Sequence, residues 1–293
     1  MKILLFGSQG QLGQSLTQTL NNSYELYLSH RDDCDLSVSD GIESLIDRVK
    51  PDLIINAAAY TQVDAAEHNR EEAFAINAKA PEVMAKKAST LNVTLLHFST
   101  DYVFDGLQER TYVETDLTSP LSYYAKTKCI GEEAIRSHLK NHLIIRTCWL
   151  YGHHSQNFVH KIIDQLFLNK PFDVVADEWG SPTSTSFVAQ SILKIIPHLK
   201  DGLFGTYHLA NAGYTSRSGF ASFIEEKLIQ LGKIEALKIS RIHSISSKDY
   251  QVIAVRPSRA ILDSTKIANA FMIEFRSWQD ELSHFLYESF SKG

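Results

Sequence analysis

The stretch Phe6–Gly13, FGSQGQLG, follows directly on the apolar run Ile3–Leu5 and places a glycine at every third position. Glycine inside regular structure costs about 0.5–1 kcal/mol relative to alanine, so this spacing indicates a backbone that turns tightly or is approached closely by another group. In a strand–turn–helix unit, Gly7 would permit the turn, Gly10 the approach of a pyrophosphate, and Gly13 the close packing of the helix on the sheet. The alternative for the same pattern is a tight turn that binds no ligand.

The first half of the chain alternates strand-like and helix-like patterns. Short apolar runs without polar alternation are typical of a parallel sheet that is buried on both faces, and helix-length connectors between them predict right-handed crossovers. The expected strands cover residues 2–6, 24–29, 52–59, 93–100 and 142–150, and the expected helices cover residues 12–21, 40–49, 70–91 and 122–138. This order predicts an α/β fold, a Rossmann-like doubly wound parallel sheet.

The pattern is less regular after residue 150. Amphipathic helices are expected over residues 158–169, 220–232 and 277–290, and strands over residues 171–175, 205–210 and 251–255. We therefore expect residues 1–150 to form a dinucleotide-binding domain and residues 151–293 to form mainly a smaller α/β substrate-binding lobe, with segments of the two interleaved. A cleft between them would lie at the carboxyl ends of the strands, where open α/β sheets bind their ligands.

Composition argues against several classes of protein. The formal net charge is −5 and no long basic run occurs, which argues against a nucleic-acid polymer as partner. The sequence also lacks the roughly 20 consecutive apolar residues that span a bilayer, so no membrane partner is expected. Its 3 cysteines include no Cys-x-x-Cys pair, which argues against a disulfide framework and a structural zinc. Because the strand-like N-terminus does not have the layout of a signal peptide, we expect a cytoplasmic protein.

Tyr124 and Lys128 stand one helical turn apart within one expected helix, so both side chains would lie on the same face. A free phenol titrates near pH 10. An ammonium about 6 Å away, at an effective dielectric of about 20, would favour the phenolate by roughly 3 kcal/mol, or about two pK units. That shift would bring the tyrosine into a useful range for acid–base catalysis. Tyrosine and lysine at this spacing are also common on helices that have no catalytic role.

A hydroxyl at a strand end strengthens the catalytic interpretation. The fourth expected strand leads into Ser99, Thr100 and Asp101, at the sheet edge where the cleft is expected. A hydroxyl there could hydrogen-bond a substrate carbonyl or hydroxyl beside the phenol, and the alternative is a Ser/Thr/Asp cap on the following loop. The nucleotide-type fold, the strand-end hydroxyl and the Tyr-x-x-x-Lys helix are together much more specific than any one of them.

The end of the second expected strand bears on the choice of cofactor. An NAD-preferring site usually places Asp or Glu there to bind the ribose 2′-hydroxyl, whereas this strand runs into His30 and Arg31. A cation suits the 2′-phosphate of NADP, so the sequence favours NADPH as cofactor. NADH is the alternative, with Arg31 then a solvated loop residue.

Blocks along the whole chain carry a resemblance to a known family. They are GSQGQLG (7–13), PDLIINAAAYTQVDAAE (51–67), INA (76–78), STDYVFDG (99–106), YAKTKCIGE (124–132), RTCWLYG (146–152), NFV (157–159), GSPT (180–183), TYHLANAG (206–213) and RPSRAILD (256–263). The chain resembles the extended short-chain dehydrogenase/reductase superfamily and, within it, the dTDP-4-dehydrorhamnose reductase family. The resemblance implies an oxidoreductase that transfers a hydride from NADPH or NADH to the C4 ketone of dTDP-4-dehydro-β-L-rhamnose. That reaction is the final step of dTDP-L-rhamnose synthesis, which supplies polysaccharide synthesis.

The resemblance also implies roles for individual residues. Tyr124 resembles the proton donor, Lys128 its activator and the binder of the nicotinamide ribose, and Thr100 the third catalytic hydroxyl. The implied cofactor contacts are Gly7, Gln9, Gly10, Gln11, Leu12, Gly13, Arg31, Asp35, Leu36, Asn56, Ala57, Ala58, Ala59, Tyr124 and Lys128. The implied substrate contacts are Thr61, Val63, Thr100, Asp101, Tyr102, Trp149 and Arg256. Core packing remains the alternative for Val63 and Trp149, and a surface salt bridge for Arg256.

The chain departs from the family pattern at a few positions. Some members carry a glutamate on the first helix in a magnesium site between subunits, and Ser15 stands there in this chain. Magnesium is therefore not expected, and we expect a monomer or a metal-independent homodimer. Arg217 replaces the usual tryptophan, Cys148 the usual serine and Glu178 the usual glutamine, which bears on substrate choice.

Two other functions remain open at this point. One is a reductase or epimerase of the same superfamily that acts on another nucleotide sugar. The other is a non-catalytic NADP-binding subunit, similar to the regulatory subunit of methionine adenosyltransferase. The presence of Tyr124, Lys128 and Thr100 together favours catalysis.

Overall fold

The apolar runs of the first half form neighbouring strands of one parallel sheet. The computed structural model describes residues 1–236 and 241–291. Its large sheet consists of β1 (Lys2–Phe6), β2 (Glu25–Ser29), β3 (Leu53–Asn56), β4 (Thr94–Thr100), β5 (His142–Thr147) and β10 (Gly205–His208). The order across the sheet is β10-β5-β4-β3-β1-β2, and every neighbouring pair is parallel. The carboxyl ends of these strands therefore meet at one edge, and the doubly wound α/β fold expected from the sequence is confirmed.

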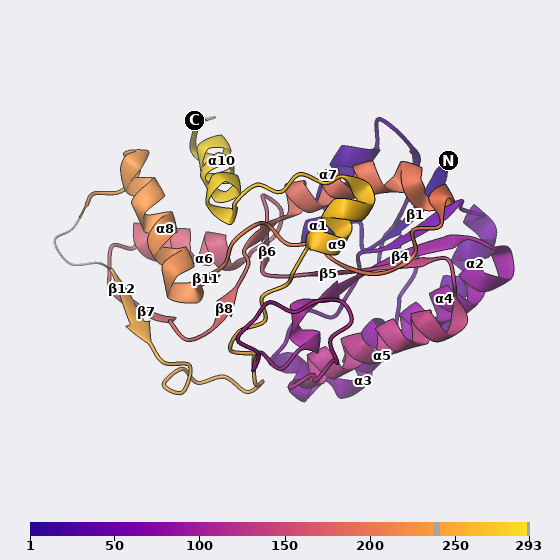
Figure 1. Cartoon of the computed structure of the whole chain (residues 1–293), viewed down its shortest axis with the longest axis horizontal. Helices are drawn as coiled ribbons and strands as arrows, with labels where there is room; N and C mark the ends of the chain where they lie inside the picture. The colour runs from indigo at the N-terminus through magenta and orange to yellow at the C-terminus, as the bar shows by residue number, and fades with distance from the viewer. Residues whose placement is uncertain (237–240, 292–293) are drawn as a thin grey trace.

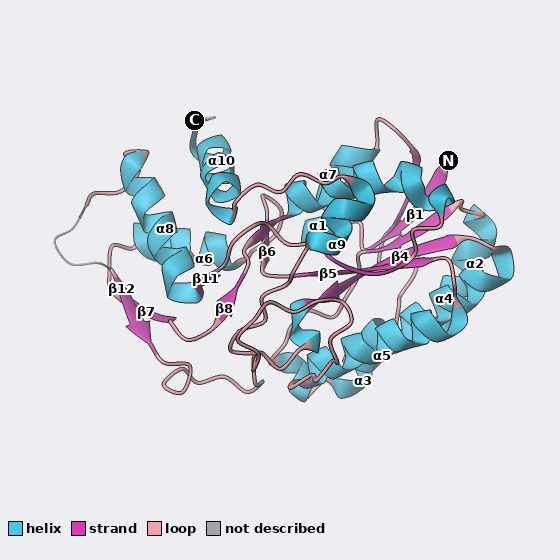
Figure 2. Ribbon diagram, in the orientation of Figure 1, coloured by secondary structure: helices cyan, strands magenta, loops and turns pink. Residues whose placement is uncertain are grey.

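Helices cover both faces of this sheet (Figures 1 and 2). One face carries α1 (Gln11–Leu20) and α7 (Thr185–Ile195), and the other carries α2 (Ser39–Val49), α4 (Ala80–Leu91) and α5 (Tyr123–His138). Alternate residues of β1 serve the two faces, since Ile3 and Leu5 pack with α1 whereas Leu4 and Phe6 pack with α2 and α4. A strand with two buried faces needs an unbroken apolar run, which is why polar alternation is absent from it.

A smaller lobe stands beside the carboxyl edge of the large sheet (Figure 1). It contains α6 (Phe158–Phe167), β7 (Phe172–Val175), α8 (Arg217–Gln230), β12 (Ile242–Ile245) and α10 (Trp278–Ser291), and β7 pairs with β12 in parallel. Its core is rich in aromatic side chains, including Tyr151, Phe220, Trp278 and Phe285. Short strand pairs, β6 (Leu150–Tyr151) with β9 (Thr183–Ser184) and β8 (Trp179–Gly180) with β11 (Thr215–Ser216), complete this half.

The second half of the chain departs from the sequence-based expectations in several places. The expected strand over residues 251–255 is wrong: this segment is a loop, and Asp64 accepts hydrogen bonds from its backbone N–H groups at Ile253 and Ala254. Ile242–Ile245 takes the place beside β7 instead. The strand expected within residues 205–210 does form, but as β10 at the edge of the large sheet next to β5. Two helices that were not predicted, α7 and α9 (Thr265–Phe271), also pack in the core of the large sheet.

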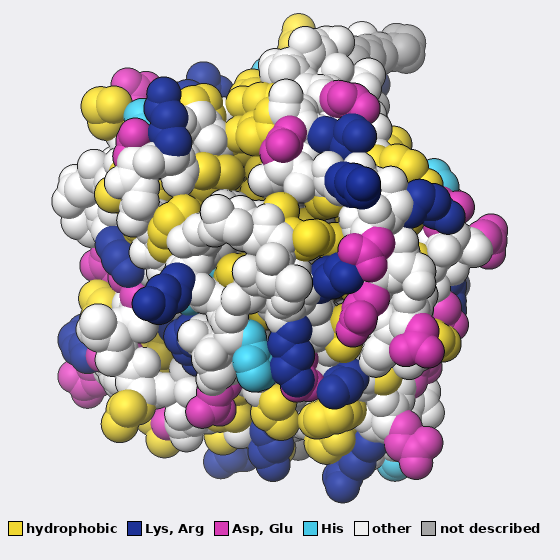
Figure 3. Space-filling model, turned by 90° about the vertical axis from the view of Figure 1, so that its right-hand side faces the viewer, with side chains coloured by type: hydrophobic (Ala, Val, Ile, Leu, Met, Phe, Trp, Pro, Cys, Tyr) yellow, Lys and Arg dark blue, Asp and Glu magenta, His cyan; other side chains and the backbone are white. Residues whose placement is uncertain are grey.

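The surface is mixed in charge. On the face formed by the large sheet and its helices, basic and acidic side chains are interspersed (Figure 3). Across residues 1–236 and 241–291, none of the helices combines the length and the apolar character needed to cross a membrane. The cysteines, Cys34, Cys129 and Cys148, are all unpaired.

Candidate active site

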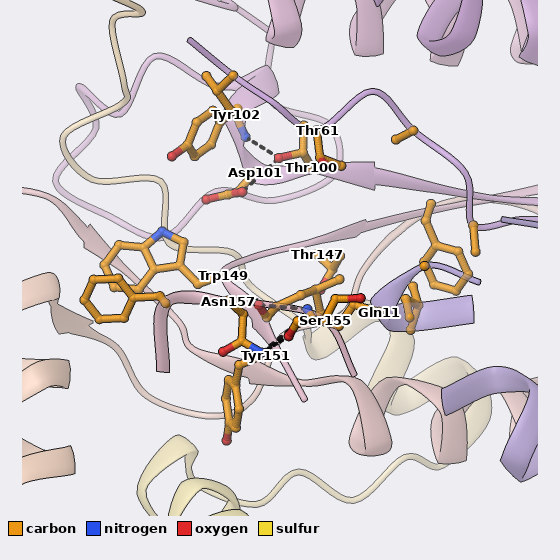
Figure 4. A pocket seen from close by; sticks show the side chains of 18 of the residues that line it. Gln11, Thr61, Thr100, Asp101, Tyr102, Thr147, Trp149, Tyr151, Ser155 and Asn157 are labelled. Carbon is orange, nitrogen blue, oxygen red and sulfur yellow. Dashed lines mark hydrogen bonds between the residues drawn. The ribbon is translucent and has the colours of Figure 1, made fainter. Parts of the chain in front are cut away.

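A cavity of about 680 Å³ opens at the carboxyl edge of the large sheet, between the sheet and the smaller lobe. This size suits a small-molecule site. Its walls come from both sides: Thr61, Thr100 and Asp101 stand on one wall, and Gln11 and the smaller lobe face them from the other (Figure 4). The lining residues are Gly7, Gly10, Gln11, Leu12, Ala57, Ala58, Ala59, Thr61, Val63, Phe98, Ser99, Thr100, Asp101, Tyr102, Tyr124, Lys128, Thr147, Trp149, Leu150, Tyr151, Ser155, Gln156, Asn157, Phe158, Arg217 and Phe220.

The glycine-rich turn has the geometry that its spacing predicts. Gly7 has a φ of +77°, and a β-carbon there would stand 2.5 Å from the backbone nitrogen of Ala58. A β-carbon on Gly13 would stand 2.0 Å from the carbonyl oxygen of Gly7, so only glycine lets α1 pack this closely on the turn. Gly10 is the N-cap of α1, and no side chain caps this helix end. Unpartnered N–H groups at a helix start form a ready site for a phosphate.

A second, smaller pocket of about 180 Å³ continues from this turn toward the end of β2. Its lining includes Gln9, His30, Arg31, Asp35 and Leu36, and it shares Gly7, Gly10, Ala58 and Ala59 with the larger cavity. The side chain of Arg31 is 76% exposed and stands 3.6 Å from the carboxylate of Glu72. The sequence-predicted contacts on the adenine side therefore gather in one place, with a largely free cation among them.

Helix α5 brings Tyr124 and Lys128 to the cavity, as their spacing predicts. Its start is fixed by the hydroxyl of Ser122, which accepts a hydrogen bond from the backbone nitrogen of Ala125 at 3.3 Å. Its middle approaches the π-helical segment η2 (Ala75–Lys79) so closely that a β-carbon on Gly131 would lie 2.2 Å from the carbonyl oxygen of Asn77. The amide of Asn77 also donates to the hydroxyl of Thr127. These contacts fix the rotation of α5.

The electrostatics of Tyr124 differ from the sequence-based expectation. Burial raises the pKa of Tyr124 above its ordinary value, while a hydrogen bond with the side chain of Thr100 acts in the opposite direction. Lys128 has no part in this shift of the pKa, and its Nζ donates to the carbonyl oxygen of Phe98 at 2.7 Å. The expectation of a phenol activated toward phenolate is therefore wrong for this state, in which Tyr124 stays protonated at neutral pH.

Thr100 and Asp101 form a buried hydrogen-bonded group beside Tyr124. The hydroxyl of Thr100 donates to one carboxylate oxygen of Asp101 at 3.0 Å and accepts from the backbone nitrogen of Tyr102 at 3.2 Å (Figure 4). The thiol of Cys148 donates to the other oxygen of Asp101 at 3.1 Å. Burial raises the pKa of Asp101 to about 6, against the lowering effect of the hydrogen bonds from Cys148 and Thr100. The Tyr102 ring meets the Tyr124 ring edge-on, with centroids 6.0 Å apart.

Two residues that depart from the family pattern meet at the opposite wall. The guanidinium of Arg217 donates to the carboxylate of Glu178 at 2.7 Å and to the phenol oxygen of Tyr102 at 3.3 Å. It also lies 4.2 Å above the ring centroid of Trp149 and 5.5 Å from that of Phe158. Sequence analysis noted Arg217 and Glu178 only as substitutions, because their positions along the chain do not reveal that they form a pair.

Asn157 joins the glycine-rich turn to the smaller lobe, and sequence analysis gave it no role. Its side-chain amide donates to the side-chain oxygen of Gln11 at 2.8 Å (Figure 4). The same amide donates to the carbonyl oxygen of Gly152 at 2.9 Å. Its own side-chain oxygen accepts from the backbone nitrogen of His160, at the start of α6. The N-cap role of Asn157 could have been predicted, because an Asn directly before an apolar helical pattern is typical of an N-cap. Its hydrogen bond with Gln11 could not, because Gln11 is far away in the sequence.

Three expected residues lie outside the walls of the two pockets. The guanidinium of Arg256 forms an ion pair with Asp64 at 2.6 Å, so the structure places it in a salt bridge behind the cavity wall. Burial alone would raise the pKa of Asp64, but the hydrogen bond from Arg256 helps to lower it. Asn56 and Gly13 are buried behind the cavity, where they support the turn and the loop after β3.

Ser15, which stands where some family members carry the magnesium-binding glutamate, makes a contact between two helices. The hydroxyl of Ser15 donates to the hydroxyl of Thr185 at 2.8 Å and joins α1 to α7. In the part of the chain that the structure describes, no group of three or more His, Cys, Asp or Glu side chains is arranged to hold a metal ion.

Comparison with known proteins agrees with this geometry. The family model described as RmlD substrate binding domain matches residues 1–290. The dTDP-4-dehydrorhamnose reductase of Aggregatibacter actinomycetemcomitans is 35% identical over 288 residues, which cover 97% of each chain. This chain belongs to the dTDP-4-dehydrorhamnose reductase family. The family's enzyme from Escherichia coli K12 is 33% identical over 297 residues and 99% of each chain. The crystal structure of the Bacillus anthracis dTDP-4-dehydrorhamnose reductase in complex with NADP superposes with a TM-score of 0.90 at 29% identity, covering 98% of this chain and 99% of that one.

Proposed function

We propose that this chain reduces the C4 ketone of dTDP-4-dehydro-β-L-rhamnose to give dTDP-L-rhamnose, with NADPH as the reductant. The observation that carries the proposal is the convergence of Tyr124, Thr100 and Lys128 on one cavity, in a chain that matches the reductase family over its whole length. The cavity lies at the carboxyl edge of the sheet, where doubly wound folds bind their ligands.

The two connected pockets fit a dinucleotide. The pyrophosphate would lie against the start of α1, at the walls that the two pockets share: Gly7, Gly10, Ala58 and Ala59. The space beside Gly10 is open to the ligand, since a β-carbon there would meet only one protein atom, the Gly7 carbonyl oxygen, at 3.3 Å. The smaller pocket would hold the adenosine, and Arg31 would contact the 2′-phosphate there. The larger cavity would hold the nicotinamide and its ribose beside Lys128. When bound, the reduced nicotinamide supplies the hydride.

Tyr124 supplies the proton in this proposal. As C4 of the sugar is reduced, negative charge develops on the ketone oxygen, and a positioned donor must neutralise it. A buried phenol with a raised pKa remains protonated at neutral pH, which is the form that reduction requires. Thr100 stands on the same cavity wall, and its single O–H, which now donates to Asp101, would turn to the substrate oxygen when the substrate binds.

The wall formed by Trp149 and Arg217 would contact the sugar diphosphate of the substrate. The indole and the guanidinium are stacked, and Glu178 holds the guanidinium in place. Such a preformed cation suits a sugar diphosphate better than an uncharged sugar. We further infer that the protein acts in the cytoplasm as a monomer or a metal-independent homodimer, which the Ser15–Thr185 contact supports because it places a hydroxyl pair where a bridging carboxylate would be needed.

The oxidation of NADPH with and without dTDP-4-dehydro-β-L-rhamnose tests the proposal. We expect oxidation only with this substrate present, and dTDP-L-rhamnose as the product by chromatography. A matched assay with a UDP-linked 4-keto sugar distinguishes another substrate preference. An enzyme that binds NADPH but oxidises it with neither sugar would contradict the proposal and favour a non-catalytic subunit.

A further inference from the structure

A buried histidine, His97, contacts Lys128 from the side of the large sheet. His97 lies on β4 and is fully buried, as is Asn56 at the end of β3. The Nδ1 atom of His97 lies 3.0 Å from the side-chain nitrogen of Asn56, and its Nε2 atom lies 3.2 Å from Nζ of Lys128. Three elements, β3, β4 and α5, thus contribute one polar side chain each to a continuous chain of contacts that ends at the cavity.

The orientation of the Asn56 amide fixes one end of this chain. Its side-chain oxygen accepts a hydrogen bond from the backbone nitrogen of Ala58 at 3.1 Å. That N–H can only donate, so the amide oxygen must face it and the amide nitrogen must face His97. The Nδ1 atom of His97 therefore accepts from Asn56 and carries a lone pair rather than a proton.

The protonation of His97 follows from this constraint. Burial lowers the pKa of His97 well below its ordinary value, so the imidazole is neutral. A neutral imidazole has one N–H group. Since Nδ1 has none, the proton must be on Nε2, which points at Nζ of Lys128.

Only the uncharged amine form of Lys128, which becomes the main form above about pH 8, can accept this hydrogen bond. An ammonium group has three donors and no acceptor, whereas an uncharged amine has two donors and one lone pair. The carbonyl oxygen of Phe98 takes one N–H of Lys128 at 2.7 Å, and the lone pair of the amine suits the Nε2–H of His97.

We propose that His97 is a positioning residue for Lys128: as the Nε2–H tautomer, oriented by Asn56, it donates to Nζ of Lys128, holds that side chain at the cavity wall and opposes its protonation until the cofactor is bound. The inference rests on the proposed role of Lys128 in the reductase reaction. The charge of Lys128 then depends on the groups that enter the cavity.

The surroundings of Lys128 agree with this assignment. Burial lowers the pKa of Lys128 to about 8, while Glu132 and Cys129 on the same helix raise it. Glu132 is itself engaged by Arg146 at 2.6 Å, and Tyr124 stands one turn before Lys128 on α5. From β4, His97 and the Phe98 carbonyl oxygen contact Nζ of Lys128.

The tautomer can be measured without any assay of activity. We expect ¹⁵N spectra of the cofactor-free full chain, labelled at histidine, to show for His97 a protonated Nε2 and an unprotonated Nδ1, with the His97→Gln spectrum giving the assignment. A protonated Nδ1, or a doubly protonated ring, would overturn the proposal. This readout stands even if the substrate proves to be another nucleotide sugar.

A pair of variants then tests the effect on Lys128. His97→Gln can still accept from Asn56 and present an N–H to Lys128, whereas His97→Leu removes both groups at similar volume. We expect His97→Leu to lower kcat about 10–100-fold and to move the pH transition of kcat upward, because the N–H that opposes the ammonium is gone. His97→Gln should retain kcat within about fivefold and keep the wild-type pH transition.

A merely structural role for His97 would change urea unfolding in both variants and leave the pH transition in place, which would contradict the proposal. If His97→Leu fails to fold, the tautomer measurement still decides it. If the wild-type protein shows no reductase activity at all, the proposed function fails, and the ¹⁵N result alone determines whether the hydrogen-bonded chain is as inferred.

Discussion

At the scale of single residues, the proposed reaction depends on Tyr124 as the proton donor. Tyr124→Phe keeps the ring and its edge-on contact with Tyr102 but removes the proton. Because a positioned proton donor contributes about 10²–10⁴-fold in rate, we expect kcat to fall by that range while NADPH still binds. Thr100→Val, which keeps the shape and removes one hydroxyl, should cost less. Steady-state NADPH oxidation and a fluorescence titration of NADPH make the comparison, and a Tyr124→Phe enzyme within a few-fold of wild type would rule out this mechanism.

At the same scale, we expect Arg31 to decide the choice of cofactor. Its side chain is exposed beside the smaller pocket and lies 3.6 Å from the carboxylate of Glu72. A charge-assisted hydrogen bond to a phosphate contributes about 1.5–3 kcal/mol, so Arg31→Ala should lower kcat/KM for NADPH about 10–100-fold and leave that for NADH nearly unchanged. Glu72→Gln serves as the control, because it removes the neighbouring charge and should not weaken NADPH. An unaltered ratio of NADPH to NADH efficiency in Arg31→Ala would refute this role.

At the scale of elements, two glycines of the glycine-rich turn have different roles: Gly13 is needed for the packing of α1, and Gly10 for the space that the ligand would occupy. A methyl group on Gly13 would collide with the Gly7 carbonyl, whereas one on Gly10 would meet only the Gly7 carbonyl oxygen, at 3.3 Å, a contact that a shift of a few tenths of an ångström relieves. Overpacking costs about 1–3 kcal/mol, which corresponds to a Tm lower by roughly 2–12 °C, so Gly13→Ala should unfold earlier. Gly10→Ala should keep its Tm but weaken NADPH, because the methyl group would occupy the place of the pyrophosphate. Thermal unfolding and NADPH titration of both variants check this, and equal Tm values would contradict the packing argument.

The elements also show what the sequence could and could not predict. The strands of the large sheet were predictable because burial on both faces demands unbroken apolar runs, and α5 was predictable from its helical pattern. The segment at 251–255 has a similar apolar pattern, yet Asp64, far away in the sequence, binds its backbone and Ile253 is left exposed. The same limit applies to the site: Tyr124 and Lys128 share a helix and so reveal their proximity, whereas His97, Arg217 and Asn157 act through partners that only the fold brings near.

At the scale of the whole molecule, the Ser15–Thr185 contact predicts independence from divalent metals. Magnesium prefers carboxylate and water oxygens, and this position offers two hydroxyl groups that satisfy each other. We expect EDTA to leave both the reductase activity and the sedimentation coefficient unchanged. Ser15→Glu is a useful comparison, since it restores a carboxylate on α1. A wild-type dimer that dissociates on chelation would show that the inference is wrong.

The stability of the whole molecule should fall in mild acid because of buried histidines. His208 on β10 is fully buried, and its Nδ1 lies 3.1 Å from the Tyr112 carbonyl oxygen while Nε2 lies 3.4 Å from the Arg146 guanidinium. An arginine can only donate, so Nε2 must accept and a second proton there would face a cation. Burial, together with the charge of Arg146, lowers the pKa of His208 to about 3.

The sign of the pH effect follows from this lowered pKa. The unfolded chain takes up a proton at His208 below about pH 6.5 and the folded chain does not, so stability is fully present above that pH and is lost as the pH falls toward 3. His97 acts in the same direction, whereas Asp101, with its raised pKa, opposes the loss below about pH 6. Replacing His208 by glutamine keeps both hydrogen bonds and removes the titrating group.

Between about pH 6.5 and 5, the free energy of unfolding measured in urea should therefore fall less for His208→Gln than for wild type. The fall in unfolding free energy should be about 2 kcal/mol larger for wild type over this interval, since each extra proton bound by the unfolded chain changes that free energy by about 1.4 kcal/mol per pH unit. His243→Gln, on the exposed strand β12, controls for the exchange itself and should follow the wild type. Parallel curves for wild type and His208→Gln would mean that His208 is not the neutral, buried group on which β10 and the large sheet depend.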